Sequence, residues 1–253
     1  MSIELRVHEL KAIIAGNDGR NAADRAFTRA VDELISAVYD DIGRVSALPA
    51  RVLFDLFVIK VLYVGRNSRD AAVIDYIGAM LEAYLDVRRL FPEDDAGRPR
   101  KLYFSDMLDA ETHPRDEPNV YEAYRRYADS ALFLSGVFAP STRRPLRGRG
   151  VMRRKGAKGV DRTYYVATGK AMYRMAAQDE HRSCTHGPET LEKLSTNFEL
   201  YADALREVSE TYITGYPTSI IADKMLDAMN RGADGDGDAV RRYADLLDTA
   251  GRD

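Results

Sequence analysis

The sequence has little of what a secreted or membrane protein needs. Its 253 residues include one cysteine, Cys184, which excludes a disulfide within the chain and favours a reducing compartment, the cytoplasm. The most apolar stretch, Val52 to Gly65, is interrupted by Asp55 and Lys60 and is shorter than the roughly 20 residues that cross a bilayer. The N-terminus lacks a basic start followed by a long apolar run, so we expect neither a signal peptide nor a membrane span.

A large excess of charge of one sign is also missing. The formal net charge is −3, which argues against a protein that coats nucleic acid with a positively charged face. Any anion must therefore be bound locally. With 45% hydrophobic residues the composition is ordinary for a soluble globular protein, and the length suffices for one sizeable core and at most two.

Helical periodicity fills most of the chain, and no strand alternation stands out. Apolar residues recur three and four positions apart across 22–42, and the run from Val52 is apolar nearly all round, which predicts the central helix of a bundle. We expect Ser68 to cap the next helix and Pro92 to end it. The sequence therefore predicts an all-α fold, a single multi-helix bundle of about eight to nine helices.

Two polar segments divide this bundle. We expect a helical bundle domain over residues 1–231, with a basic loop insertion at 143–160. Residues 232–253 contain the acidic linker ADGDGD and a last amphipathic helix, and we expect them to pack on the same domain.

The strongest pattern is a heptad seam between Pro188 and Thr211. Its positions are Leu191, Leu194, Phe198, Tyr201, Leu205, Val208 and Tyr212. A two-stranded coiled coil usually has charged residues beside such a seam, whereas small residues such as Ser195 and Ala202 flank this one. Because small residues let neighbouring helices approach closely, we predict one helix inside the bundle rather than a coiled-coil partner.

Motifs for metals and nucleotides are incomplete. His181, Cys184 and His186 lie within six residues and are weak candidates for zinc, but no second pair of ligands accompanies them. The segment TGKAM, residues 168–172, holds the Gly-Lys pair of a phosphate loop without its first glycine or its magnesium-binding hydroxyl. We therefore expect no metal and no cofactor.

One acidic residue supports a catalytic alternative. Asp55 interrupts the most apolar helix, where it would pair with a neighbour such as Arg51, point from the exposed side of the helix, or take part in proton transfer. A helical enzyme would need a buried polar pocket, formed by Asp55 and inner tyrosines, in which perturbed titratable groups converge. The sequence identifies no second convergent group, so it favours a non-catalytic protein.

The stretch RRPLRGRGVMRRKGAKGVDR, residues 143–162, holds nine basic residues and one acidic residue. It has no apolar face to bury, which indicates a surface loop. We predict that an anionic partner is bound by Arg143, Arg144, Arg147, Arg149, Arg153, Arg154, Lys155 and Lys158. Tyr164 and Tyr165 follow the loop and are candidates to stack on bases.

This loop favours a non-catalytic binding or adaptor protein that docks an acidic protein or assembly partner. The first alternative is a nucleic-acid-binding regulatory protein that uses the same loop with the nearby tyrosines. A solvated insertion without any ligand is the third interpretation, and the sequence does not indicate an oligomeric state.

Three segments resemble an uncharacterised all-helical family of bacterial proteins. They are DSALFLSGVF (129–138), TYYVATGKAMYRMAA (163–177) and LSTNFELYADALREVSE (194–210). The family pattern is D-x-A-L-F-x-x-G-F-F, then Y-Y-x-x-x-G-x-x-A-Y, then a helix ending in a similar E-V-S-E, and Val137 departs from it. The resemblance covers roughly 52–214 and implies that Gly136 and Gly169 permit close helix contact or end a helix. It implies no reaction, cofactor or site residue.

The connection between the first two segments is shorter in that family than in this chain. The resemblance therefore implies that the basic stretch is an enlargement particular to this protein.

Overall fold

The computed structural model describes residues 2–16, 25–40, 48–86, 89, 120–137, 162–178 and 187–213. Within these residues the chain is all-α, with eight α-helices and no strand, which confirms the predicted fold class. The helices are α1 (Ile3–Gly16), α2 (Arg25–Asp40), α4 (Ala50–Val58), α5 (Ala71–Ala83), α8 (Val120–Val137), α10 (Arg162–Gln178), α11 (Pro188–Thr196) and α12 (Phe198–Val208). Two π-helical segments, η1 (Ile59–Gly65) and η3 (Ser209–Ile213), extend α4 and α12.

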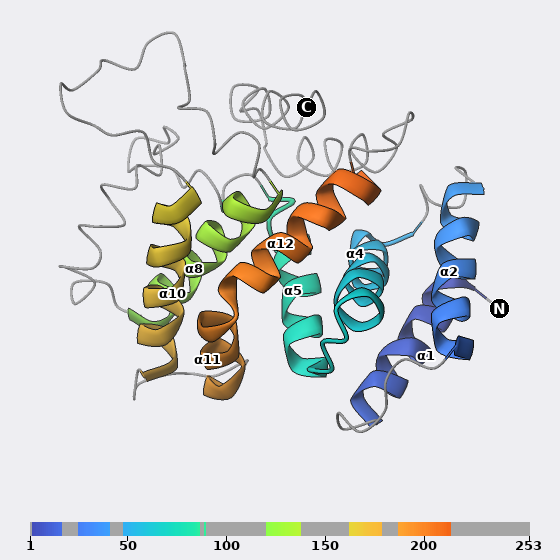
Figure 1. The fold of residues 1–253 in the computed structure, drawn as a ribbon, viewed down its shortest axis with the longest axis horizontal. Coiled ribbons are helices and arrows are strands. Elements are labelled where there is room, and N and C mark those ends of the chain that lie inside the picture. The colour runs from blue at the N-terminus through green and yellow to red at the C-terminus, as the bar shows by residue number, and fades with distance from the viewer. Residues whose placement is uncertain are drawn as a thin grey trace, which may run out of the picture.

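The helices pack side by side, with α4 and α5 in the middle of the molecule (Figure 1). Helices α1 and α2 contact α4 on one side, and α8, α10, α11 and α12 gather on the other. Helix α12 contacts both α8 and α4 and so joins the two sides. One continuous cluster of buried apolar side chains extends from α1 to η3.

Helix α4 is the central helix that its sequence predicts. Every residue from Val52 to Ile59 is buried, and only at Lys60 does a side chain turn outward to pair with Asp32 on α2. In the part of the chain that the structure describes, no helix combines the length and the apolarity that a bilayer crossing requires.

Helix α5 begins and ends at residues other than those expected. Asp70, rather than Ser68, caps it, because the Asp70 carboxylate accepts a 3.1 Å hydrogen bond from the backbone N–H of Val73. The helix ends at Ala83, well before Pro92, because the backbone of Tyr84 leaves the helical conformation at φ −82° and ψ 4°. This turn places the Tyr84 ring against Phe133 of α8, with 4.9 Å between the ring centroids.

The seam residues lie inside the bundle, as predicted, but they form two helices rather than one. The break is at Asn197, whose φ of −107° and ψ of 29° end α11 and precede α12. The change of direction leaves α11 against α10 and α5 and lets α12 continue across α8 and α4. The heptad pattern does not reveal this break because seam positions on both sides of it are buried.

Two glycines permit close helix contact, as the resemblance implies. A Cβ atom on Gly136 of α8 would lie 2.6 Å from the Cβ of Leu205 on α12. A Cβ atom on Gly169 of α10 would lie 2.3 Å from the ring of Phe198. The close approach of the helices at both positions therefore requires glycine, which has no side chain.

Candidate functional site

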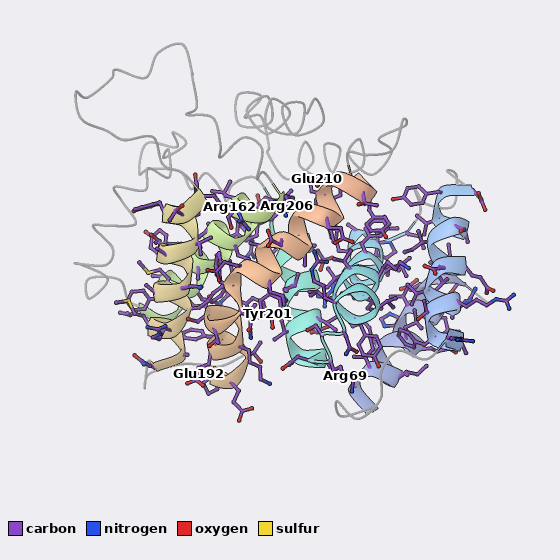
Figure 2. The ribbon with its side chains drawn as sticks, in the orientation of Figure 1. Arg69, Arg162, Glu192, Tyr201, Arg206 and Glu210 are labelled. Carbon is purple, nitrogen blue, oxygen red and sulfur yellow. The ribbon has the colours of Figure 1, made fainter. Side chains whose placement is uncertain are left out.

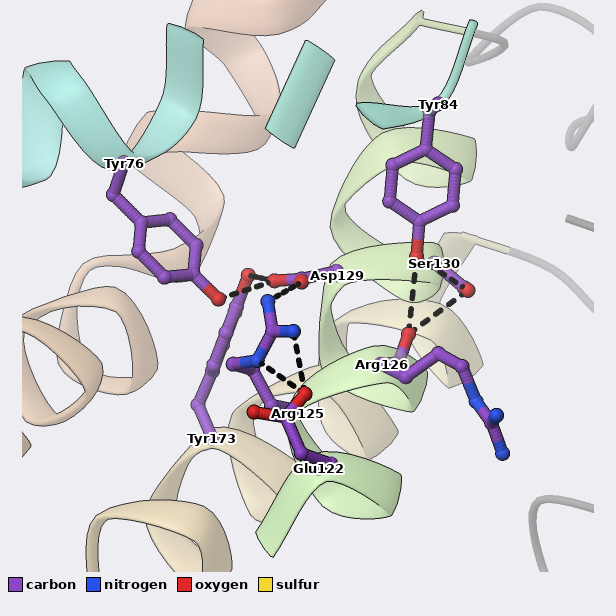
Figure 3. Close-up of polar contacts among 8 residues, drawn as sticks. All are labelled: Tyr76, Tyr84, Glu122, Arg125, Arg126, Asp129, Ser130 and Tyr173. Carbon is purple, nitrogen blue, oxygen red and sulfur yellow. Dashed lines mark hydrogen bonds and ion pairs between the residues drawn. The ribbon is translucent and has the colours of Figure 1, made fainter. Parts of the chain in front are cut away.

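A buried carboxylate, Asp129 of α8, lies where α5, α8 and α10 meet, and its residue is 5% exposed. Tyr76 of α5 donates a 2.6 Å hydrogen bond to its Oδ1 atom, and Tyr173 of α10 donates one of 2.7 Å to the same atom. Arg125, one helical turn earlier, donates from Nη1 to Oδ2 at 3.1 Å (Figure 3). Three donors from three helices therefore hold both oxygens of one carboxylate.

The guanidinium of Arg125 joins this carboxylate to a second one. Its Nε and Nη2 atoms donate to Oε2 of Glu122 at 3.1 and 2.6 Å. Residues 122, 125 and 129 are three and four positions apart, so the helical repeat alone places their side chains on one face of α8. The side chain of Glu122 is 42% exposed and that of Asp129 only 7%.

A second polar group lies beside the first. The hydroxyl of Tyr84 lies 2.8 Å from Oγ of Ser130 and donates to the backbone carbonyl of Arg126 at 3.1 Å. The Ser130 hydroxyl also donates to that carbonyl, at 2.9 Å (Figure 3). These contacts fix the turn after α5 against the middle of α8.

Burial dominates the electrostatics of the cluster. Burial raises the pKa of Asp129, while Arg125 and the two tyrosine hydroxyls oppose that rise. Burial, followed by the neighbouring Asp129 charge, raises the pKa of Tyr76 and of Tyr173 well above the ordinary value of 10.0. Both tyrosines therefore stay protonated at neutral pH and remain hydrogen-bond donors.

A cavity of about 250 Å³ lies between α5 and α8 next to this cluster. Tyr76, Tyr84 and the small or apolar residues Ala79, Met80 and Ala83 form its less polar walls. Among the residues that the structure describes, the charged lining consists of Arg89, Arg125 and Arg126 with Glu122 and Asp129. Three guanidinium groups against two carboxylates make this described part of the lining net positive, which favours an anionic occupant.

The acid that the sequence singles out lies elsewhere. Asp55 of α4 is 3% exposed and accepts hydrogen bonds from Arg51 at 2.8 Å and from Lys11 of α1 at 2.7 Å. Asp75 of α5 accepts from the same two cations. The pairing with Arg51, one of the alternatives that the sequence left open, is confirmed, and Asp55 is not among the described residues that line the pocket.

Sequence reasoning missed Asp129 as a site residue, although a signal was present. Asp129 is the first residue of the segment DSALFLSGVF, and Tyr173 lies in TYYVATGKAMYRMAA, two of the segments that carry the resemblance. The structure joins these two segments at that aspartate and that tyrosine. Tyr76 could not have been selected, because a tyrosine at a helix-period position is usually a core residue.

The eight basic residues predicted to bind an anionic partner, from Arg143 to Lys158, lie outside the described residues, as do His181, Cys184 and His186. Their roles stay predictions. The last residue of the basic stretch, Arg162, begins α10, and Figure 2 labels it together with Arg206 of α12. Arg162 donates to the Asp203 carboxylate at 2.6 Å, and Arg206 contacts the same oxygen at 3.1 Å.

The candidate stacking residues lie on the first turn of α10. Tyr165 is 7% exposed, and Tyr164 is partly buried and packs against the core. Stacking on a base would require Tyr165 to leave the core, so the stacking role of this pair stays a prediction.

Among the described residues, no three histidine, cysteine, aspartate or glutamate side chains are grouped so that they could hold a metal ion. Comparisons with protein-family models, curated proteins and solved structures found no match for this chain. The resemblance to a helical bacterial family therefore stays an expectation.

Proposed function

We propose that this protein binds a small oxyanion, a carboxylate or phosphate on a small organic body, in the pocket between α5 and α8. The observation that supports the proposal is the net positive charge of the described residues that line a concave site, with Arg125 held in place by Asp129. The volume of about 250 Å³ lies below the roughly 300–1,000 Å³ of sites for drug-sized ligands, so the ligand is small. The methyl and aromatic walls suit an apolar portion of that ligand.

Binding is favoured over catalysis because Asp129 is already engaged. A general base needs a lone pair directed at the proton that it abstracts. Oδ1 of Asp129 accepts from two tyrosines, and Oδ2 accepts from Arg125. The converging titratable groups would otherwise suit the enzyme alternative, but their contacts make Asp129 a support for Arg125 rather than a free base.

Isothermal titration calorimetry at low salt tests this function, with inorganic phosphate, phenyl phosphate and succinate as probes. We expect phenyl phosphate to bind. Arg89→Ala removes a partly exposed charge, and Arg125→Lys keeps the charge but removes the two-donor edge of the guanidinium, so each should weaken binding by roughly two- to fivefold. Saturating ligand should also raise the melting temperature, since a ligand at 100 times its Kd adds about 2.7 kcal/mol to the free energy of unfolding.

The matched control is Arg29→Ala on α2, which removes one arginine charge from a side chain that is 81% exposed. Arg29 does not line the pocket. The substitution should leave the affinity unchanged. The proposal fails if no probe binds at millimolar concentration, or if Arg29→Ala weakens binding as much as the pocket variants do.

A second candidate function is docking of an acidic protein through the basic segment. Its support is the concentration of nine basic residues against one acidic residue in 143–162, within a chain of net charge −3. Fluorescence anisotropy with a glutamate-rich peptide and with a single-stranded oligonucleotide separates the acidic-protein partner from nucleic acid. The control keeps the loop length and replaces Arg143, Arg147, Arg149 and Arg153 with glutamine.

We expect the peptide to bind and the glutamine variant to lose that binding. A loss of about a thousandfold in oligonucleotide affinity over a few-fold rise in salt would instead indicate several phosphate contacts and favour nucleic acid. Equal binding by the wild type and the glutamine variant would overturn both uses of the loop.

A further inference from the structure

Arg125 presents two edges, and a carboxylate occupies each of them. Nη1 faces Oδ2 of Asp129, whereas Nε and Nη2 together face Oε2 of Glu122. The Nε and Nη2 edge is a fork of two parallel donors, the arrangement that binds a carboxylate or phosphate through two oxygens. Glu122 therefore occupies the edge of Arg125 best suited to an oxyanion ligand.

The two carboxylates differ in how firmly they are held. Asp129 is buried, and Tyr76 and Tyr173 donate to it from two other helices, so removing it from Arg125 would strand a buried charge. Glu122 lies in the first turn of α8 with a side chain that is 42% exposed. Water can replace the contacts of Glu122 when its side chain rotates outward, whereas no water reaches Asp129 as easily.

An oxyanion in the pocket also could not share Arg125 with Glu122 without repulsion between two like charges at close range. We infer that Glu122 is an internal competitor: it occupies the fork of Arg125 in the empty pocket, and the ligand's oxyanion displaces it on binding. This inference rests on the proposed function and adds to it a residue that sets the affinity. Asp129 keeps Arg125 in place throughout.

Removing the competitor should tighten binding. We expect Glu122→Gln and Glu122→Ala to bind phenyl phosphate roughly two- to fivefold more tightly than the wild type, in line with the modest value of a partly exposed ion pair. Calorimetric titration gives the affinity, and circular dichroism of each variant confirms that its helices form. Two variants of different shape are used so that a packing effect of one of them is recognised.

The matched control is Glu199→Gln. Glu199 lies in the first turn of α12, pairs with Lys170 at 2.6 Å, and has a side chain that is 49% exposed, so the change removes the same charge from the same kind of position. Glu199 does not line the pocket. The affinity of the Glu199→Gln variant for phenyl phosphate should therefore equal that of the wild type.

Each outcome separates the two proposals. Tighter binding by both Glu122 variants, with Glu199→Gln unchanged, supports the competitor role. Unchanged or weaker binding by the Glu122 variants overturns that role while leaving the pocket as an oxyanion site. Absence of binding by the wild type and by all variants overturns the proposed function itself.

Discussion

Tyr173 of α10 donates a 2.7 Å hydrogen bond to Asp129 of α8, and the two residues are 44 positions apart in the chain. Tyr76 of α5, which is 53 positions from Asp129, donates to the same oxygen at 2.6 Å. The ring centroids of the two tyrosines are 6.3 Å apart in an edge-to-face arrangement. One carboxylate oxygen therefore ties three helices together.

The stability contributed by Asp129 should decrease as the pH rises. Burial raises its pKa in the folded protein above the value of about 3.9 expected in the unfolded chain, so the folded state holds the proton more tightly. The contribution is fully present below about pH 4 and is lost as the pH rises through the folded pKa. Urea unfolding of the wild type and Asp129→Asn between pH 4 and 8 measures it as the difference between the two proteins.

Other acidic groups are common to both proteins and cancel in this difference. A difference that grows with pH would show that Arg125 and the tyrosine hydroxyls outweigh burial, and it would contradict the prediction.

The two tyrosine donors should be coupled. Tyr76→Phe or Tyr173→Phe removes one donor and leaves the other, and each change should lower the free energy of unfolding by about 1.5–3 kcal/mol, because the lost bond is made to a carboxylate. The double variant leaves the buried Oδ1 atom of Asp129 without either donor. Its free energy of unfolding should fall by more than the sum of the decreases in the two single variants. A double-mutant cycle from urea unfolding measures this coupling, which we expect at about 0.5 kcal/mol or more. Strict additivity would contradict it.

Close packing of α8 on α12 should make Gly136 intolerant of a side chain. In Gly136→Ala the new Cβ atom would meet the Cβ of Leu205 at 2.6 Å and the carbonyl oxygen of Ala202 at 3.0 Å. Overpacking costs about 1–3 kcal/mol, and the gain in helix propensity of about 1 kcal/mol offsets only part of it. Thermal unfolding should show a lower melting temperature.

Gly16→Ala at the end of α1 is the control, because no described residue lies within 4 Å of a Cβ atom at that position. It should be neutral or slightly stabilising. Equal melting temperatures for the two alanine variants would contradict the packing argument.

Asp55 should contribute to stability rather than to binding. Asp55→Ala would leave the partly buried cations Lys11 and Arg51 with only the Asp75 carboxylate among the contacts described above, and breaking a buried charge network costs about 3–5 kcal/mol. We expect urea unfolding to show a large decrease in the free energy of unfolding. The affinity of the folded variant for phenyl phosphate should not change.

The exposed ion pair of Glu33 with Arg29 provides the comparison. Its side chains are 52% and 81% exposed, so Glu33→Ala should cost less than about 1 kcal/mol. Similar losses for Asp55→Ala and Glu33→Ala would contradict the structural role of Asp55.

The limits of sequence reasoning about the fold appear at helix ends. The seam from Leu191 to Val208 predicted a buried helix correctly, because the spacing of apolar residues on a helix is a local property. It did not predict the break at Asn197, since that break depends on where α10 and α8 lie. The cap at Asp70 was missed because Ser68 and Asp70 are both good capping residues two positions apart. The early end at Tyr84 accompanies the packing of its ring against Phe133 of α8, which no local pattern encodes.

The sequence by itself determined that the chain is helical and that the run from Val52 forms its centre, because these features follow from spacings within one helix. It left the pairing of Asp55 with Arg51 as one of several alternatives. Only the tertiary structure decided that Asp129 meets Tyr76, Tyr173 and a cavity rather than forming one more ion pair on a helix surface. The physical reason is distance along the chain: a hydrogen bond between residues 44 or 53 positions apart exists only after three helices have packed, and no periodicity within any one of them encodes it.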